Sequence, residues 1–226
     1  MNTPAADGLN DLLAAAGFLC LGDCAVHPAD GLPNPSGQDA RQLVLIGSTG
    51  PSLWSVFSRS PEFCDGAPHP LDRYTKRVLT QIATTIGAIA VFPFEGPPYH
   101  PFQRWATRCG EFSRSPMGVL THATYGPWAG FRAAFVTGRT RDYDTAATTP
   151  GPCETCTDKP CISACPANAL SEETGYDVPR CRSHLDADRT AGCWSGCRAR
   201  HACPVGQSHA QTPENGRFHM TSFIAL

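Results

Sequence analysis

The sequence predicts an α+β protein in which a mixed α/β domain precedes a small cysteine-rich domain stabilised by bound cofactors. Short apolar segments of strand length alternate with helix-like segments over the first two thirds of the chain. A polar, proline-punctuated stretch then runs from Gly138 to Pro152. Eight of the twelve cysteines fall after it. A chain of 226 residues with 41% apolar content is long enough for one sizeable core plus such a module.

The first elements follow from apolar runs and turn residues. A helix is expected over Gly8 to Ala16 and a strand over Phe18 to Val26. The proline- and glycine-rich stretch Pro28 to Gly37 is expected to be a loop. The continuous apolar run Gln42 to Gly47 predicts a buried strand, which ends in the turn-forming residues Gly47 to Gly50.

A longer helix is expected to begin around His69 to Asp72, with Asp72 as its N-cap. The apolar residues of one helix face are Val78, Leu79, Ile82 and Ile86. Another buried strand is expected over Ala88 to Phe92.

The proline-rich stretch Pro93 to Pro101 predicts a fixed loop, and a helix is expected from about Phe102 to Cys109. Val119 to His122 and Trp128 to Thr137 predict a strand pair across the turn Tyr125 to Pro127. The small, polar linker that follows places the domain boundary near residue 150, with one domain over 1–150 and a second over 151–226.

The eight clustered cysteines form two runs that each end in Cys-Pro. The first run reads C-x2-C-x4-C-x3-C-P and the second C-x11-C-x3-C-x5-C-P. In bacterial two-cluster runs the cysteine before proline ligates the other cluster, so the pattern indicates two [4Fe–4S] clusters. By this crossover rule one cluster would be held by Cys153, Cys156, Cys161 and Cys203, and the other by Cys165, Cys181, Cys193 and Cys197.

Two other uses of eight thiols are open. Structural zinc sites usually carry paired C-x2-C knuckles, and this region has only Cys153/Cys156. Four disulfides would need an oxidising compartment, and Met1 to Asn10 has no basic segment before the apolar stretch Leu12 to Leu21. The other cysteines are interpreted as ordinary buried or half-buried thiols: Cys20, Cys24, Cys64 and Cys109.

Charge and hydropathy argue against two classes of partner. The formal net charge is −2 and no Lys/Arg run compensates locally, so nucleic acid is not expected as a partner. No apolar stretch reaches about 18 residues, and no membrane partner is expected. Without an export signal in the sequence, the expected compartment is the cytoplasm.

The cysteine region resembles the ferredoxin-like half of the epoxyqueuosine reductase and reductive dehalogenase families, both cobalamin-dependent. The segments that carry this resemblance are PCETCTDKPCISACP, YDVPRCRSHL and GCRARHACPVG. The resemblance implies two clusters beside a corrinoid. It also implies an external electron-donor protein of the ferredoxin, flavodoxin or reductase type.

The N-terminal part resembles the cobalamin-trafficking (CblC-type) chaperone, whose fold is similar to flavin-dependent nitroreductases. The matching stretches are QLVLIGSTG, PLDRYTKRV and SPMGVLTHATYGPWAGFR. The last departs from the family pattern I-H-P-x-x-G-G-W-x-x-x-R, because Ala123 follows His122 and Gly126-Pro127 precedes Trp128. This resemblance implies a cobalamin-chaperone-like domain.

A corrinoid needs an aromatic or apolar face, close backbone approach from glycines, and donors for its amide fringe. Each candidate residue has an ordinary alternative in core packing or as a solvated side chain. The candidate cofactor contacts are Gln103, Arg104, Trp105, His122, Tyr125, Gly126, Trp128 and Arg132.

The function expected from these features is single-electron transfer through two clusters to a corrinoid, in cobalamin reduction or processing or in a cobalamin-dependent reduction. One alternative is a plain ferredoxin-type carrier without corrinoid. Another is a flavin-dependent reductase, although no glycine-rich dinucleotide fingerprint is present.

Overall fold

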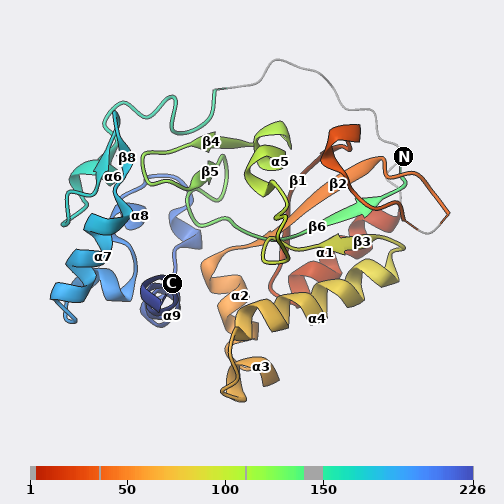
Figure 1. Cartoon of the computed structure of the whole chain (residues 1–226), viewed down its shortest axis with the longest axis horizontal. Helices are drawn as coiled ribbons and strands as arrows, with labels where there is room; N and C mark the ends of the chain where they lie inside the picture. The colour runs from red at the N-terminus through yellow and green to blue at the C-terminus, as the bar shows by residue number, and fades with distance from the viewer. Residues whose placement is uncertain (1–3, 36, 110, 140–149, 226) are drawn as a thin grey trace. The chain divides into compact units, whose positions relative to one another are not determined.

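The computed structural model describes residues 4–35, 37–109, 111–139 and 150–225 (Figure 1). The chain divides into two units that interleave in sequence. The first unit comprises the described residues within 1–48, 52–111 and 130–148, and the second those within 49–51, 112–129 and 149–226. The division therefore differs from a single cut near residue 150, because a segment from the middle of the chain belongs with the cysteine-rich tail.

The first unit is built on an antiparallel sheet of four strands in the order β1-β2-β6-β3. Its strands are β1 (Leu19–Ala25), β2 (Gln42–Ser48), β3 (Ile89–Val91) and β6 (Gly130–Thr137). Its helices are α1 (Pro4–Ala15), η1 (Pro28–Asp30), α2 (Gly50–Phe57, except its first two residues), α3 (Pro61–Cys64), α4 (Pro70–Thr85) and α5 (Phe102–Cys109).

The core of this unit lies along the two central strands. Leu45 and Ile46 of β2 and Phe135 and Val136 of β6 are all 0% exposed. Because successive residues of a strand point to opposite faces, unbroken burial requires cover on both faces. Figure 1 shows α4 and α5 on opposite sides of the sheet. The buried strand predicted at Gln42 to Gly47 and the helix predicted at Phe102 to Cys109 are confirmed.

The expected N-cap of the long helix is wrong. The cap is His69, which has φ +54, and Pro70 is the first helical residue, so Asp72 lies inside the first turn. Proline is favoured at that position because its fixed φ suits a helix start and its missing N–H would have no helical partner. The predicted apolar face is confirmed at Leu79 and Ile82, which are 0% and 7% exposed.

The predicted strand pair across Tyr125 to Pro127 is also wrong. The strand β5 (Leu120–His122) pairs with β4 (Phe112–Arg114), whereas β6 pairs with β2 and β3. A single bridge between His122 and Gly126 closes a tight turn directly after β5. The strand β5 therefore pairs with the segment just before it in sequence, whereas β6 pairs with strands that are distant in sequence.

The second unit consists of short elements around two small cores. Its other elements are α6 (Pro160–Ser163), β7 (Leu170–Ser171), β8 (Gly175–Tyr176), α7 (Val178–Ala187), η2 (Gly192–Ser195), α8 (Arg198–His201), η3 (Gln207–His209) and α9 (Pro213–Ala225). The C-terminal helix α9 packs Met220, Phe223 and Ile224 against the core of Leu185, Cys193 and Trp194. A ferredoxin-like fold for this unit stays a prediction.

None of the helices in the described ranges combines the length and apolar content that crossing a membrane requires.

Candidate metal centre

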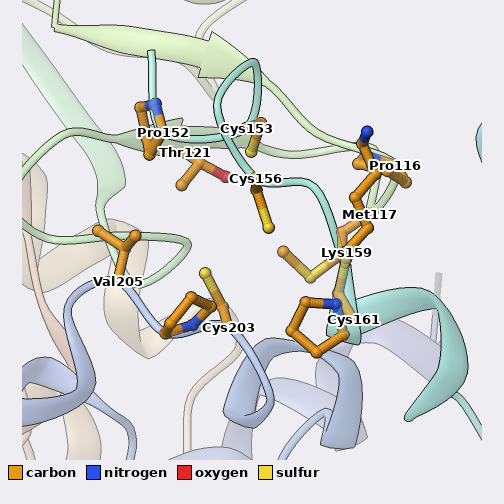
Figure 2. Close-up of a pocket in the computed structure, with 12 residues that line it drawn as sticks. Pro116, Met117, Thr121, Pro152, Cys153, Cys156, Lys159, Cys161, Cys203 and Val205 are labelled. Carbon is orange, nitrogen blue, oxygen red and sulfur yellow. The ribbon is translucent and has the colours of Figure 1, made fainter.

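A pocket in the second unit is lined by four of the eight clustered cysteines. Cys153 and Cys156 lie in the loop before α6, Cys161 lies in α6, and Cys203 follows α8. Figure 2 shows the sulfur atoms of Cys156 and Cys203 directed into the same space. These four cysteines are the set that the crossover rule assigns to one cluster. The fold therefore brings the cysteine of the second Cys-Pro pair to three cysteines of the first run.

The rest of the pocket wall is largely apolar. It is formed by Pro116, Met117, Thr121, Pro152, Lys159, Pro160, Pro204 and Val205. Such a wall limits water access, and water access is one of the levers that control the properties of a bound metal group.

Local backbone geometry places these cysteines. Lys159 has φ +38 and leads into Pro160, which begins α6 and sets the position of Cys161. The N–H of Cys153 donates a hydrogen bond of 3.2 Å to the hydroxyl of Ser113 in β4. The cysteine loop is thereby attached to the segment 112–129 as well as to its own helix.

A close approach of two backbone segments supports the loop that carries Cys203. Gly126 has φ +60, and a Cβ there would collide with the carbonyl oxygen of Val205. Gly206 has φ +72 and faces the carbonyl group of Tyr125 in the same way. Both positions require glycine, because a side chain has neither the space nor the backbone conformation it needs.

Two of the four thiols, Cys161 and Cys203, have raised pKa values. Burial raises the pKa of Cys161 and of Cys203, and the charge of Cys153 raises both further. The ammonium group of Lys159, which is 2.8 Å from Glu172, has its pKa raised mainly by that carboxylate and further by Cys156 and Cys153. Closely spaced, partly buried thiols favour the neutral form unless a bound cation compensates the charge of the thiolates. A thiol that coordinates a metal is deprotonated by it.

One polar atom in the pocket wall lacks a partner. Thr121 in β5 is 0% exposed, and its hydroxyl has no hydrogen-bond partner among the described residues. A buried hydroxyl without a partner costs free energy, so its presence beside four sulfur atoms is an observation that a bound acceptor would explain. Sequence reasoning missed this residue, since a threonine in a short strand carries no motif.

The second set of four cysteines lies where the two cores of the unit meet. Cys165 belongs to one core and Cys193 to the other, and Cys181 packs against both. Burial raises the pKa of Cys181 and of Cys193, and the charges of Cys197 and Cys165 raise both further. A hydrogen bond from Tyr176 acts in the opposite direction on Cys181.

Across the described ranges, no group of three or more His, Cys, Asp or Glu side chains has the spacing of ligands to a single metal ion.

The aromatic residues predicted as corrinoid contacts in the second unit differ in whether their polar atoms have protein partners. The ring of His122 accepts hydrogen bonds at Nδ1 from the N–H groups of Thr124 and Tyr125, at 3.0 and 3.2 Å. Tyr125 packs between His122 and His209, with ring centroids 4.7 and 4.9 Å away. Trp128 is 5% exposed and its indole N–H is another buried donor without a partner in the described residues.

The predicted contacts of the first unit differ in exposure. Gln103 and Arg104 lie exposed on α5. Trp105 is 1% exposed, and its indole N–H donates to Asp30 over 3.0 Å. Arg132 is half-buried and its Nε donates to the hydroxyl of Ser48 over 2.9 Å. Burial lowers the pKa of Arg132 to about 10.

Two cysteines outside the two runs, which the sequence did not single out, lie close together in the first unit. The Sγ atoms of Cys24 in β1 and Cys109 at the end of α5 are 3.0 Å apart. Arg108 lies 3.5 Å from the sulfur of Cys24 and forms an ion pair with Asp30. Because the two cysteines are 85 positions apart, no spacing motif relates them. The one signal in the sequence is that Arg108 directly precedes Cys109.

Comparisons with known proteins identify the fold. No family model matches the chain, and no curated protein matches its sequence. The B12-trafficking protein CblC of C. elegans, described as a homologue of human MMACHC, has a similar structure, with 12% identity, a TM-score of 0.55, and coverage of 95% of this chain and 91% of that one. A selenomethionine-labelled epoxyqueuosine reductase is similar over 92% of this chain and 67% of its own, with 15% identity and a TM-score of 0.52. The chain thus has a mixed α/β fold similar to both structures.

Proposed function

We propose that this chain is an iron–sulfur electron-transfer protein that holds two [4Fe–4S] clusters and passes single electrons to a corrinoid bound by its first unit. The observation that carries the proposal is the pocket lined by Cys153, Cys156, Cys161 and Cys203. Four thiolates are the ligand set of a [4Fe–4S] cluster. The set is drawn from two separate runs, as the crossover rule requires.

The residues of the pocket fit such a group in three respects. Four sulfur donors face one cavity, the wall around them is largely apolar, and a buried hydroxyl on that wall lacks an acceptor. Hydrogen bonds to sulfur and exclusion of solvent are two of the levers that set a cluster's reduction potential. The second set of cysteines shares the thiol identity and the mutual proximity, with Tyr176 as a donor to Cys181.

A bound cluster of this type supplies one-electron redox chemistry. The chain's own residues then have separate tasks. The eight cysteines would hold the clusters, and Thr121 and Tyr176 would donate hydrogen bonds to sulfur. Lys159 provides a positive charge near Cys153 and Cys156. Met117, Val205 and the four prolines of the wall limit water access.

The corrinoid part of the proposal is supported by the fold similarity to a B12-trafficking protein and by donors on α5. Gln103 and Arg104 are exposed and could donate to the amide fringe of a corrinoid. Tyr99, 64% exposed, provides an accessible aromatic face close by in sequence. Trp105 and Trp128 are 1% and 5% exposed, so we assign each of them a packing role within its own unit.

The first experiment measures cofactor content. Anaerobically reconstituted full-length protein should contain about eight iron and about eight sulfide per chain. Zinc in place of iron, or far fewer than eight iron atoms, would refute the cluster assignment.

The pairing of cysteines is tested by comparing double variants. If the crossover assignment is right, Cys153→Ser with Cys203→Ser removes two ligands of the same cluster and leaves about four iron atoms. Cys153→Ser with Cys165→Ser removes a ligand from each cluster and leaves close to none. Sequential pairing predicts the reverse result. Cys64→Ser is the control, because Cys64 is exposed and outside both sets.

Corrinoid binding is tested by incubating the reconstituted protein with hydroxocobalamin and recording visible spectra after gel filtration. Arg104→Gln should weaken retention by about tenfold, as expected for the loss of one charge-assisted hydrogen bond. Arg59→Gln, a change at another exposed arginine of the same unit, should not. A protein with full iron and no corrinoid retention would be a plain electron carrier, and retention of flavin instead would indicate a flavin-dependent reductase.

A further inference from the structure

We propose that Cys24 and Cys109 form a redox-active dithiol that peroxide-class oxidants convert to a disulfide, in a site separate from the eight clustered cysteines. The two sulfur atoms are 3.0 Å apart, with the Cys109 thiol donating to the Cys24 sulfur. All groups of this site belong to the first unit. The proposal does not depend on whether iron or a corrinoid is bound.

Local structure explains why the two cysteines meet. The strand β1 has a bulge between Cys20 and Asp23, after which Cys24 pairs with Leu43. Gly22 within the bulge has φ +125, and a Cβ there would lie 3.4 Å from the Cβ of Cys109. Glycine suits this position because an L side chain rarely adopts that φ, and the end of α5 lies next to the bulge.

Arg108 makes the pair chemically unequal. Its Nε lies 3.5 Å from the sulfur of Cys24, and its two terminal nitrogens bind the carboxylate of Asp30 at 3.0 and 2.7 Å. Asp30 also accepts a hydrogen bond from the indole N–H of Trp105, so the carboxylate that binds the guanidinium is itself held in place. The hydrogen bond from Cys109 and the charge of Arg108 lower the pKa of Cys24 to about 7, against the effect of burial. Cys24 is therefore the nucleophile.

Cys109 has the opposite character. Its hydrogen bond to Cys24, its burial and the negative charge of the Cys24 thiolate all raise its pKa. It stays protonated while Cys24 is a thiolate. When Cys24 becomes a neutral sulfenic acid, the charge that opposed the ionisation of Cys109 is gone, so the second thiol is released for its own step.

The chemistry balances with one equivalent of hydrogen peroxide. The Cys24 thiolate attacks one peroxide oxygen, so an S–O bond forms, the O–O bond breaks, and the leaving hydroxide takes a proton to become water. Cys109 then loses its proton and attacks the Cys24 sulfur. An S–S bond forms, the S–O bond breaks, and the oxygen leaves as a second water. Two thiols lose two electrons in total, and the peroxide gains them.

Access favours a small oxidant. Cys24 is 6% exposed and Cys109 is half-buried. A pocket borders the same ion pair, lined by His27, Ala29, Asp30, Pro101, Arg104, Trp105 and Arg108. Peroxide is small enough to reach a sulfur of this exposure, whereas a bulky disulfide is not. Cys64 is exposed and lies outside this site, so it serves as a comparison.

The test uses the full-length reconstituted protein treated with one equivalent of hydrogen peroxide, followed by alkylation and mass spectrometry of proteolytic peptides. The expected product is a peptide pair linked through Cys24 and Cys109, reversed by dithiothreitol. Over-oxidation of Cys24 without a link, or reaction at Cys64 while Cys24 and Cys109 stay reduced, would overturn the proposal. This readout needs no variant and follows one specific bond, so loss of iron from the other cysteines does not affect it.

Variants then test the roles of the individual residues. Cys109→Ser should leave a trappable sulfenic acid at Cys24, and Cys20→Ser on the same strand should leave the linked peptide unchanged. Arg108→Gln should slow formation of the link by about tenfold at pH 7 and shift its pH profile upward, because less of Cys24 is thiolate. Arg108→Lys, which keeps the charge, should restore much of the rate. An unchanged pH profile in Arg108→Gln would remove Arg108 from this positioning role.

Discussion

Replacing Thr121 by valine should make the cluster held by Cys153, Cys156, Cys161 and Cys203 harder to reduce. The Thr121 hydroxyl is fully buried in the wall of that pocket and has no partner among the described residues. If it donates to a cluster sulfur, the hydrogen bond is stronger in the reduced state, which carries one more negative charge. Its removal should therefore lower the reduction potential.

The size of the shift follows from the energy of one buried hydrogen bond. A net contribution of about 0.5–1.5 kcal/mol corresponds to about 20–60 mV for a one-electron couple, since a tenfold change in equilibrium is about 59 mV or about 1.4 kcal/mol. The potential is measured by redox titration followed by electron paramagnetic resonance. Iron content is measured on the same sample, so that a lost cluster is not mistaken for a shifted one.

Two variants serve as controls for this experiment. Thr121→Ser keeps a hydroxyl and should keep the potential. Thr75→Val removes the other fully buried threonine hydroxyl that lacks a partner, which lies on α4 in the first unit. It should change neither potential. A potential that stays within about 10 mV in Thr121→Val at full iron content would refute the reasoning.

Three further outcomes are expected. Gly126→Ala should destabilise the protein by about 1–3 kcal/mol in urea unfolding, because the residue has φ +60 and a Cβ would collide with the Val205 carbonyl; an unchanged midpoint would contradict the predicted clash. The pKa of Cys24 is lowered from 9.0 to about 7, so the unfolded chain binds more protons between these values and stability should rise from pH 7 to pH 9; Cys24→Ser should flatten that rise. Tyr99→Ala should weaken cobalamin retention in gel filtration without changing iron content, because the side chain is 64% exposed; equal loss of both would point to misfolding.

The parts of the fold that the sequence predicts well are those set by local patterns. The apolar run at β2 and the helix at α5 were expected with nearly the observed bounds, since continuous apolar residues and a proline-marked helix start act over a few residues. The prediction of a strand pair across Tyr125 to Pro127 was wrong because it too rested on a local pattern. A turn between two apolar segments is a local signal, but β5 pairs with the strand before it, and β6 pairs with strands far back in the chain that the turn does not specify.

The two candidate sites also differ in whether a sequence pattern could predict them. The first cysteine set was predictable because the position of Cys203 before proline implies a partner far back in the chain, and the pocket brings that residue to Cys153 and Cys156. The pair Cys24 and Cys109 was not predictable. Neither cysteine lies in a motif, and their contact depends on a bulge in β1 that no residue pattern predicts.

The interleaved course of the chain has a consequence for how the protein is made and cut. During synthesis the segment 112–129 leaves the ribosome before Cys153 or any later cysteine. The contacts that Ser113, Gly126 and Trp128 of this segment make with the tail can therefore form only after the tail has been synthesised. A fragment that starts at residue 151 would lack β4, β5 and Thr121. The cysteine-rich tail is therefore not expected to form the candidate metal centre by itself. A chimeric protein designed to carry this centre would have to include the segment 112–129 as well.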